Sequence, residues 1–170
     1  MQKLSKKEIK KIFKHEQRSK LIHVVAENIQ YAKNVASIFR ICDAGGVSRL
    51  YLTGISHTPP FGKELRKVSR NKEKSVEWHY FESSVKLLSS LKSQGFKIIA
   101  IELCRESFPI QELRDKIKPF DKICLVVGNE VYGVTSRTLD VCDMATVIPM
   151  YGKGASLNVT SSLAIALFNS

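Results

Sequence analysis

The stretch Ile148-Pro-Met-Tyr-Gly-Lys-Gly-Ala-Ser-Leu-Asn-Val-Thr-Ser-Ser-Leu-Ala-Ile-Ala-Leu-Phe168 joins a short apolar strand to an apolar helix through a loop that contains two glycines. Gly152 and Gly154 lack a Cβ, so this loop can adopt positive φ and bring its backbone close to a ligand. Ser156 and Asn158 are residue types that cap helix N-termini. In open α/β sheets, ligands bind where strands end and helices begin. The stretch therefore indicates either a small-ligand site or an ordinary strand-to-helix connection, and these residues alone leave both interpretations open.

Apolar, β-branched runs alternate with helical patterns along the rest of the chain. This alternation predicts an α/β fold, with a mostly parallel sheet and helices on both faces. The expected strands span residues 21–26, 49–53, 76–81, 97–103, 122–127 and 145–150. The expected helices span residues 4–18, 33–44, 83–94, 135–142 and 157–168, with a looser basic helix or loop at 61–70. We expect one domain over residues 21–170, preceded by a basic helical extension over residues 1–20.

Positive charge is concentrated in two short segments of this 170-residue chain, whose net charge is +11. Residues 1–20 carry eight Lys/Arg and two Glu, and residues 61–74 carry six and two. Such clusters favour a polyanionic partner, with nucleic acid the first candidate, because neutralising phosphates releases counterions. A solvated lysine face is the alternative, and a membrane-surface helix is less favoured because the N-terminal apolar stripe is thin.

Several classes of protein are disfavoured by the composition. No apolar run approaches the roughly 20 residues needed to span a bilayer, and no signal-peptide core follows the basic N-terminus. We therefore expect a cytoplasmic protein without membrane contact. The four cysteines show neither a C-x-x-C pair nor histidine partners at zinc spacing, so neither a structural zinc nor a disulfide framework is expected.

Two further segments combine glycine or polar residues with the ends of expected strands. In the helix expected at 33–44, the apolar stripe is formed by Val35, Ile38, Phe39 and Cys42. Arg40 lies near the opposite side, and Asn34 stands at the expected N-cap. Gly128-Asn-Glu-Val-Tyr-Gly133 follows the strand at 122–127 and offers backbone donors and the carboxylate of Glu130. Taken singly, these residues are better explained as a surface arginine, a helix cap and a tight turn.

Together, the segments form three ordered motifs. The first is Asn34-Val-Ala-Ser-Ile-Phe-Arg40 with Asp43-Ala-Gly-Gly-Val47, the second is Gly128-Asn-Glu-x-x-Gly133, and the third is Ile148-Pro-Met150 with Ser156-Leu-Asn158-Val159. In this order they resemble the motifs of the SpoU (TrmH-like) branch of the SPOUT RNA methyltransferases. The resemblance runs from about residue 21 to the C-terminus, so residues 21–170 are identified as a SPOUT methyltransferase domain.

The resemblance implies transfer of a methyl group from S-adenosylmethionine to a ribose 2′-hydroxyl in RNA, without a metal. It also implies a homodimer and a deep C-terminal trefoil knot, which is a rare exception to the rule against threaded loops. Carried over by position, the residues implied to bind the cofactor are Glu102, Leu103, Val127, Gly128, Asn129, Ile148, Met150, Ser156 and Leu157.

The catalytic residues implied by the resemblance are Arg40, Asn34, Glu130, Ser156 and Asn158. Arg40 matches an arginine proposed in the family to act as the base on the 2′-hydroxyl. A guanidinium keeps its proton in almost any protein setting, so binding the adjacent phosphate and stabilising oxyanion charge is the favoured role. Asn34 is expected to bind the substrate or orient Arg40, and Glu130 to hold the arginine or a loop amide. Ser156 and Asn158 are expected to contact cofactor and ribose.

Competing functions are less well supported. The glycines at 152 and 154 miss a dinucleotide-binding fingerprint because the third glycine is absent. A serine hydrolase lacks its G-x-S-x-G elbow around Ser156. The remaining rival is a non-catalytic RNA-binding protein of the same fold. Small relatives without a separate RNA-recognition domain act mainly on tRNA, so tRNA is the favoured substrate and rRNA the alternative.

Overall fold

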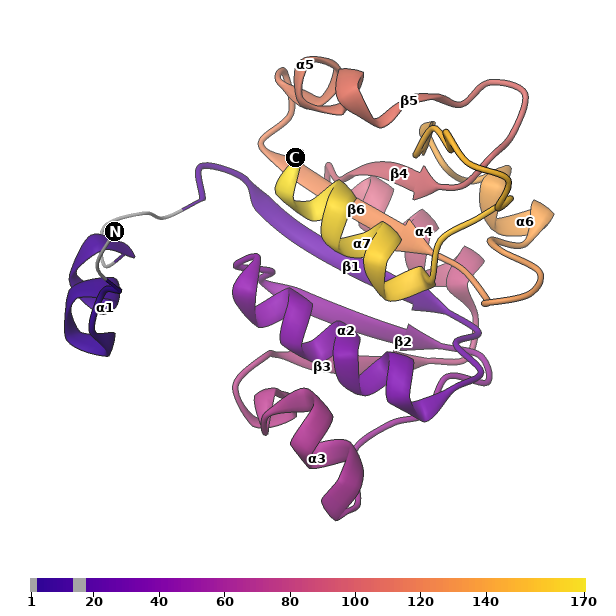
Figure 1. Ribbon diagram of the computed structural model, residues 1–170. Helices are drawn as coiled ribbons and strands as arrows, with labels where there is room; N and C mark the ends of the chain where they lie inside the picture. Colours follow the sequence, from indigo (N-terminus) through magenta and orange to yellow (C-terminus); the bar gives the residue numbers. More distant parts are fainter. Residues whose placement is uncertain (1–2, 14–17) are drawn as a thin grey trace.

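A computed structural model describes residues 3–13 and 18–170 (Figure 1). Its strands are β1 (Leu21–Glu27), β2 (Arg49–Thr53), β3 (Trp78–Phe81), β4 (Lys97–Ile101), β5 (Phe108–Pro109), β6 (Lys122–Val127) and β7 (Met144–Val147). Its α-helices are α1 (Lys6–Phe13), α2 (Ala32–Ala44), α3 (Lys63–Ser69), α4 (Ser84–Ser93), α5 (Leu113–Ile117), α6 (Ser136–Leu139) and α7 (Val159–Phe168). Two short 3₁₀ helices are η1 (Lys72–Lys74) and η2 (Ile110–Glu112).

The strands form one seven-stranded sheet in the order β3-β2-β1-β6-β4-β7-β5. Every pairing in it is parallel, so the predicted mostly parallel sheet is confirmed in a stricter form. Strands β1, β2 and β3 follow one another toward one edge of the sheet, and the chain then crosses to the other side of β1 to form β4. The carboxyl ends of β6, β4 and β7 therefore lie side by side, which is where an open parallel sheet binds ligands.

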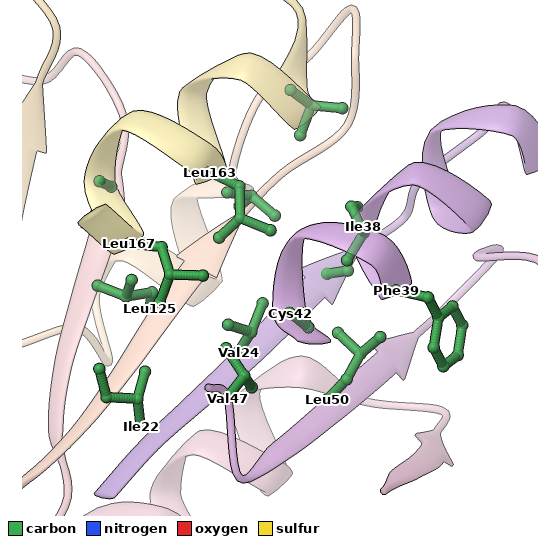
Figure 2. Packing of buried hydrophobic residues seen from close by; sticks show 14 of the residues in the cluster. Ile22, Val24, Ile38, Phe39, Cys42, Val47, Leu50, Leu125, Leu163 and Leu167 are labelled. Atoms are coloured by element: carbon green, nitrogen blue, oxygen red, sulfur yellow. The ribbon is translucent and has the colours of Figure 1, made fainter. Parts of the chain in front are cut away.

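Helices cover both faces of the sheet, as predicted. Alternate residues of a strand point to opposite faces, and Val24 and Val25 of β1 accordingly belong to two different apolar clusters. The α2 and α7 helices pack on the first face (Figure 2), and α4 packs on the second. Figure 2 shows side chains of α2, α7, the strands and the turn before β2 packed on the first face, namely Ile22, Val24, Ile38, Phe39, Cys42, Val47, Leu50, Leu125, Leu163 and Leu167.

Some predicted boundaries differ from the structure. The predicted strands at 97–103 and 145–150 end early, at Ile101 and Val147, because the residues that follow leave the sheet and line a cavity. The segment that forms β5, η2 and α5 was not predicted, because these elements are only two to five residues long. The helix predicted at 4–18 is observed as α1 over Lys6–Phe13, and residues 14–17 of that prediction lie outside the described part of the chain.

Two cations anchor the chain just before β1. The guanidinium of Arg18 donates to the carbonyl oxygens of Gly45 and Leu167, at the ends of α2 and α7. Lys20 donates to the carbonyl oxygens of Ile117, Lys118 and Phe120, where α5 ends. Cations are favourable at helix C-termini, where carbonyl groups lack helical partners. The chain therefore enters the sheet from a fixed point. Within the described residues, no helix has the length and apolarity needed to cross a bilayer.

Candidate active site

A cavity of about 270 Å³ opens at the carboxyl ends of β4, β6 and β7. Three segments that leave these strands form most of its wall, and the start of α7 closes it. All nine residues that the sequence marks for cofactor binding line this one cavity, namely Glu102, Leu103, Val127, Gly128, Asn129, Ile148, Met150, Ser156 and Leu157. The fold thus brings together residues from positions 102 to 157 that only a shared family pattern had connected.

The charge of this cavity is opposite to that of the whole chain. Glu102 and Glu130 are the charged residues among those that line it, although the chain carries a net charge of +11. The remaining wall combines backbone groups with apolar side chains such as Leu103 and Met150. An acidic lining attracts a cationic ligand and disfavours an anionic one.

The loop between Gly128 and Gly133 is a closed turn. The backbone groups of Asn129 and Gly133 exchange two hydrogen bonds of 2.9 Å. Gly133 has a φ of 66°, and a Cβ there would lie 2.1 Å from Oε2 of Glu102. The same carboxylate accepts a 2.8 Å hydrogen bond from the amide of Val134. Gly133 is therefore favoured by its positive φ, whereas a Cβ at Gly128 would lie 2.1 Å from the backbone carbon of Gly133. The tight turn, one of the two interpretations of this segment, is present.

A chain of hydrogen bonds links the three sequence motifs. The side-chain amide of Asn158 donates to Oδ1 of Asn34 over 3.3 Å, and the amide of Asn34 donates to Oε1 of Glu130 over 2.7 Å. Glu130 also accepts from the backbone amides of Gln30 (2.9 Å) and Tyr31 (3.1 Å). Residues 96 and 124 positions apart in the sequence are thus joined at the edge of the cavity.

Glu130 is ionised in this arrangement. Partial burial of the carboxyl group raises its pKa, but the donors Asn34, Gln30 and Tyr31 outweigh this effect and hold the pKa of Glu130 below its ordinary value. The negative charge lies at the N-terminus of α2, where the helix dipole also favours it. The predicted contact between Glu130 and a loop amide is present. No ion pair joins Glu130 to Arg40 within the described residues.

Two predicted helix caps are wrong, and one is confirmed. Asn34 is not an N-cap, because α2 begins at Ala32 with Tyr31 as its cap. Asn158 is the N-cap of α7 and accepts a 2.8 Å hydrogen bond from the amide of Thr160. Ser156 lies two residues before this cap, on the wall of the cavity.

The glycines at 152 and 154 do not have the role predicted for them. Neither adopts positive φ, and neither lines the cavity. A Cβ at either position would meet no atom within 4 Å. The loop is exposed here, so no close approach of the backbone requires glycine. The cavity is instead lined by the residues on either side, Met150 and Ala155 to Leu157.

Arg40 is exposed on α2 and does not line the cavity of its own chain. It lies six residues after Asn34 on the same helix, a rotation of about 240° at 3.6 residues per turn. Asn34 contacts Glu130 and Asn158, so Arg40 lies on a different face of α2 from the one that joins this network. Of the five predicted catalytic residues, the structure brings Asn34, Glu130 and Asn158 into one network and places Ser156 on the adjacent wall.

Sequence reasoning missed Glu27, a second anchor of this region. Its side chain is buried at the end of β1, and it accepts hydrogen bonds from the amide of Thr135 (2.9 Å) and the hydroxyl of Thr138 (2.6 Å). It thereby fixes the start of α6 to the sheet. A single acidic residue directly after an apolar strand was the available signal. No metal-binding cluster of His, Cys, Asp or Glu occurs among the residues described, and all four cysteines are free.

Comparisons with known proteins extend this picture. The sequence model of the SpoU rRNA Methylase family matches residues 21–168. The tRNA (guanosine(18)-2′-O)-methyltransferase of Aquifex aeolicus is 36% identical over 156 residues, which cover 90% of this chain and 70% of that protein. The Escherichia coli enzyme of the same name is 28% identical over 148 residues, which cover 85% of this chain and 60% of the relative.

Solved structures agree with these matches. The TrmH/SpoU tRNA modifying enzyme of A. aeolicus superposes with a TM-score of 0.77 at 32% identity, over 96% of this chain and 79% of that one. An AdoMet-bound rRNA methyltransferase from Sinorhizobium meliloti shares the fold, with a TM-score of 0.78 at 19% identity over 97% of this chain and 69% of that one. The chain therefore belongs to the SpoU family of RNA 2′-O-methyltransferases.

Proposed function

We propose that this member of the SpoU family transfers a methyl group from S-adenosylmethionine to a ribose 2′-hydroxyl of tRNA. The observation that carries the proposal is the hydrogen-bonded chain Asn158–Asn34–Glu130 at the edge of an acidic cavity. It joins all three family motifs at the place where the predicted cofactor residues meet. A helix cap and a tight turn that served only folding would not require these contacts.

The cavity suits S-adenosylmethionine in size and charge. Its volume of about 270 Å³ is near the lower end of the range for small-molecule sites, roughly 300 Å³. The sulfonium group of the cofactor is cationic, and Glu102 and Glu130 supply the negative potential. Backbone groups at Val127 to Asn129 and at Ile148 can hydrogen-bond the polar parts, while Leu103, Met150 and Leu157 cover the apolar parts.

The residues of this chain would act mainly by positioning and electrostatics. When bound, the cofactor supplies the methyl group and a neutral thioether leaving group. Arg40 would bind the RNA phosphate beside the target ribose and stabilise charge on O2′ as the hydroxyl proton leaves. Asn34 uses both ends of its side chain within the network, so its role is to fix the start of α2, the helix that carries Arg40. Ser156, on the cavity wall, is available to contact cofactor or ribose.

A homodimer is the assembly that gives Arg40 a place in the reaction. Arg40 is exposed and does not line the cavity of its own chain, so a second copy whose cavity faces this side of α2 would complete the site. This agrees with the dimer implied by the family resemblance. The deep trefoil knot implied by the same resemblance stays a prediction, as does a cytoplasmic location.

The proposed substrate rests on the names of the relatives and on charge. The A. aeolicus and E. coli relatives are named for methylation of guanosine 18 of tRNA, and we extend this substrate class to the present chain. Exposed cations on α1, α3 and η1 supply the expected phosphate contacts, with residues 1–20 as a basic extension to the methyltransferase domain at 21–170. The family description names rRNA, which is the alternative substrate.

Three measurements test the proposal. Calorimetry is expected to show binding of S-adenosylmethionine, and tritium transfer to unmodified tRNA is expected to exceed transfer to ribosomal RNA. Mass spectrometry of the digested product should place the added methyl on a ribose. Cofactor binding without transfer to either RNA would contradict the proposal and support a non-catalytic RNA-binding protein.

A further inference from the structure

The turn beside the cavity presents a large aromatic side chain to solvent. Tyr132 lines the cavity, yet 85% of its surface is exposed, and its neighbour Val131 is 66% exposed. Exposed apolar side chains are common singly, but these two occupy adjacent positions at the mouth of the cavity. They stand one and two residues after Glu130, which belongs to the hydrogen-bonded chain described above.

The backbone beneath Tyr132 is held by several hydrogen bonds. Oδ1 of Asn129 accepts from the amides of Val131 (2.9 Å) and Tyr132 (3.1 Å), and its amide group donates to the carbonyl of Asn28 (2.8 Å). The backbone bonds between Asn129 and Gly133 close the turn. The ring therefore projects from a backbone that is already ordered, and a tyrosine has only two side-chain torsions left to fix on binding.

A fixed, exposed aromatic ring beside a ribose-modifying site suits a nucleobase. Sequence-specific RNA recognition targets single-stranded loops and bulges, whose unstacked bases are free to stack on aromatic side chains. An aromatic side chain provides a stacking surface for such a base. A ribose whose 2′-hydroxyl reaches the cavity carries its base within one glycosidic bond, so the base lies close to the mouth of the cavity.

We propose that Tyr132 is the stacking surface for the nucleobase of the target nucleotide, and that it thereby orients the ribose toward the cavity. This inference rests on the proposed function, because it assumes that RNA is the substrate. It assigns Tyr132 to the RNA and not to the cofactor. Stacking accepts any base, so Tyr132 contributes affinity and orientation while the identity of the base is read elsewhere.

The experiment compares Tyr132→Ala, Tyr132→Phe and Tyr132→Trp with the wild type. Tyr80→Ala is the control, because Tyr80 is another exposed tyrosine but lies on β3, at the far edge of the sheet from the cavity. Binding of an unmodified tRNA transcript is measured by fluorescence anisotropy, methyl transfer by tritium incorporation, cofactor affinity by calorimetry and subunit mass by light scattering. Thermal melting checks that each variant is folded.

Tyr132→Ala is expected to lower kcat/KM for tRNA at least tenfold and to weaken tRNA binding. Tyr132→Phe and Tyr132→Trp should stay within about threefold of the wild type, since both keep a stacking ring. Cofactor affinity and subunit mass should not change. The proposal is wrong if Tyr132→Ala behaves like Tyr80→Ala, if its loss appears in cofactor affinity, or if it dissociates the assembly. A wild type that binds tRNA without methylating it would refute the proposed function, while the anisotropy arm would still decide the role of Tyr132.

Discussion

Replacing Glu130 by Gln is the sharpest test of the hydrogen-bonded chain. The carboxylate accepts three donors, the amides of Gln30 and Tyr31 and the side chain of Asn34. A glutamine has one acceptor oxygen and turns the other position into a donor. Whichever way it is oriented, at least one N–H group then faces an NH₂ group. The substitution keeps the size of the side chain, so its effect reports on hydrogen bonding and charge and not on packing.

The expected loss follows from the contacts. A hydrogen bond to a charged group contributes about 1.5–3 kcal/mol, and partial exposure of Glu130 reduces this to about 1–2 kcal/mol. For a chain of this size the melting temperature should fall by roughly 2–8 °C. If α2 then positions Arg40 less well and the transition state loses the same stabilisation, kcat falls by about tenfold.

The effect should also depend on pH. The pKa of Glu130 is lower in the folded protein than in the unfolded chain, so its stabilising contribution is fully present above the ordinary glutamate pKa. The contribution disappears as the pH falls through the folded-state pKa. The difference in unfolding free energy between wild type and Glu130→Gln should therefore be largest near neutral pH and should shrink below about pH 4.5.

Urea unfolding at pH 7, 5 and 4 measures this difference, with tritium transfer to tRNA at pH 7 as the activity assay. Glu82→Gln is the control, because Glu82 is an exposed carboxylate outside the cavity. If Glu130→Gln has the urea midpoint and kcat of the wild type at pH 7, the chain of hydrogen bonds does not support the site. A stability loss with unchanged kcat would make Glu130 a purely structural residue.

Three further predictions concern other parts of the molecule. Arg40→Ala should abolish methyl transfer and leave the affinity for S-adenosylmethionine measured by calorimetry within about twofold, and transfer near the wild-type rate would refute its catalytic assignment. Gly133→Ala should destabilise the fold by about 1–3 kcal/mol in urea unfolding, because the residue has positive φ and its Cβ would collide with Glu102. The control Gly152→Ala should change stability by less than about 0.5 kcal/mol. Equal effects of the two substitutions would contradict the assignment of the turn. Burial lowers the pKa of His23 to about 4, so neutral His23 stabilises the fold fully above about pH 6.5, and up to about 3 kcal/mol is lost as the pH falls from there toward 4. His23→Phe should lose less stability over that range, and parallel pH profiles of the two proteins would show that His23 does not titrate there.

The features that were predicted best from the sequence are those that depend on local residue patterns. The bounds of β2 and β6 were predicted correctly, since each is a short apolar run between polar residues. The nine residues predicted to bind the cofactor line one cavity because the segments that carry them leave β4, β6 and β7, and parallel strands end at the same edge. The order of the strands is set by packing between distant segments, so the sequence alone could not supply it. The small β5–α5 segment was missed for a different reason, because elements so short leave no detectable period.

The error at Asn34 shows why the site itself was harder to predict than the fold. Local rules favour Asn as a helix cap, and they place the start of α2 after it. The structure begins the helix earlier, at Ala32, because the amides at its entrance are bonded by Glu130, about a hundred residues away in the sequence. Since the carboxylate of Glu130 accepts these amide hydrogen bonds in place of a capping side chain, the side chain of Asn34 is free to join Glu130 to Asn158. A polar residue that is redundant for the helix it occupies is thus available for the site, and only the tertiary contact of Glu130 reveals this.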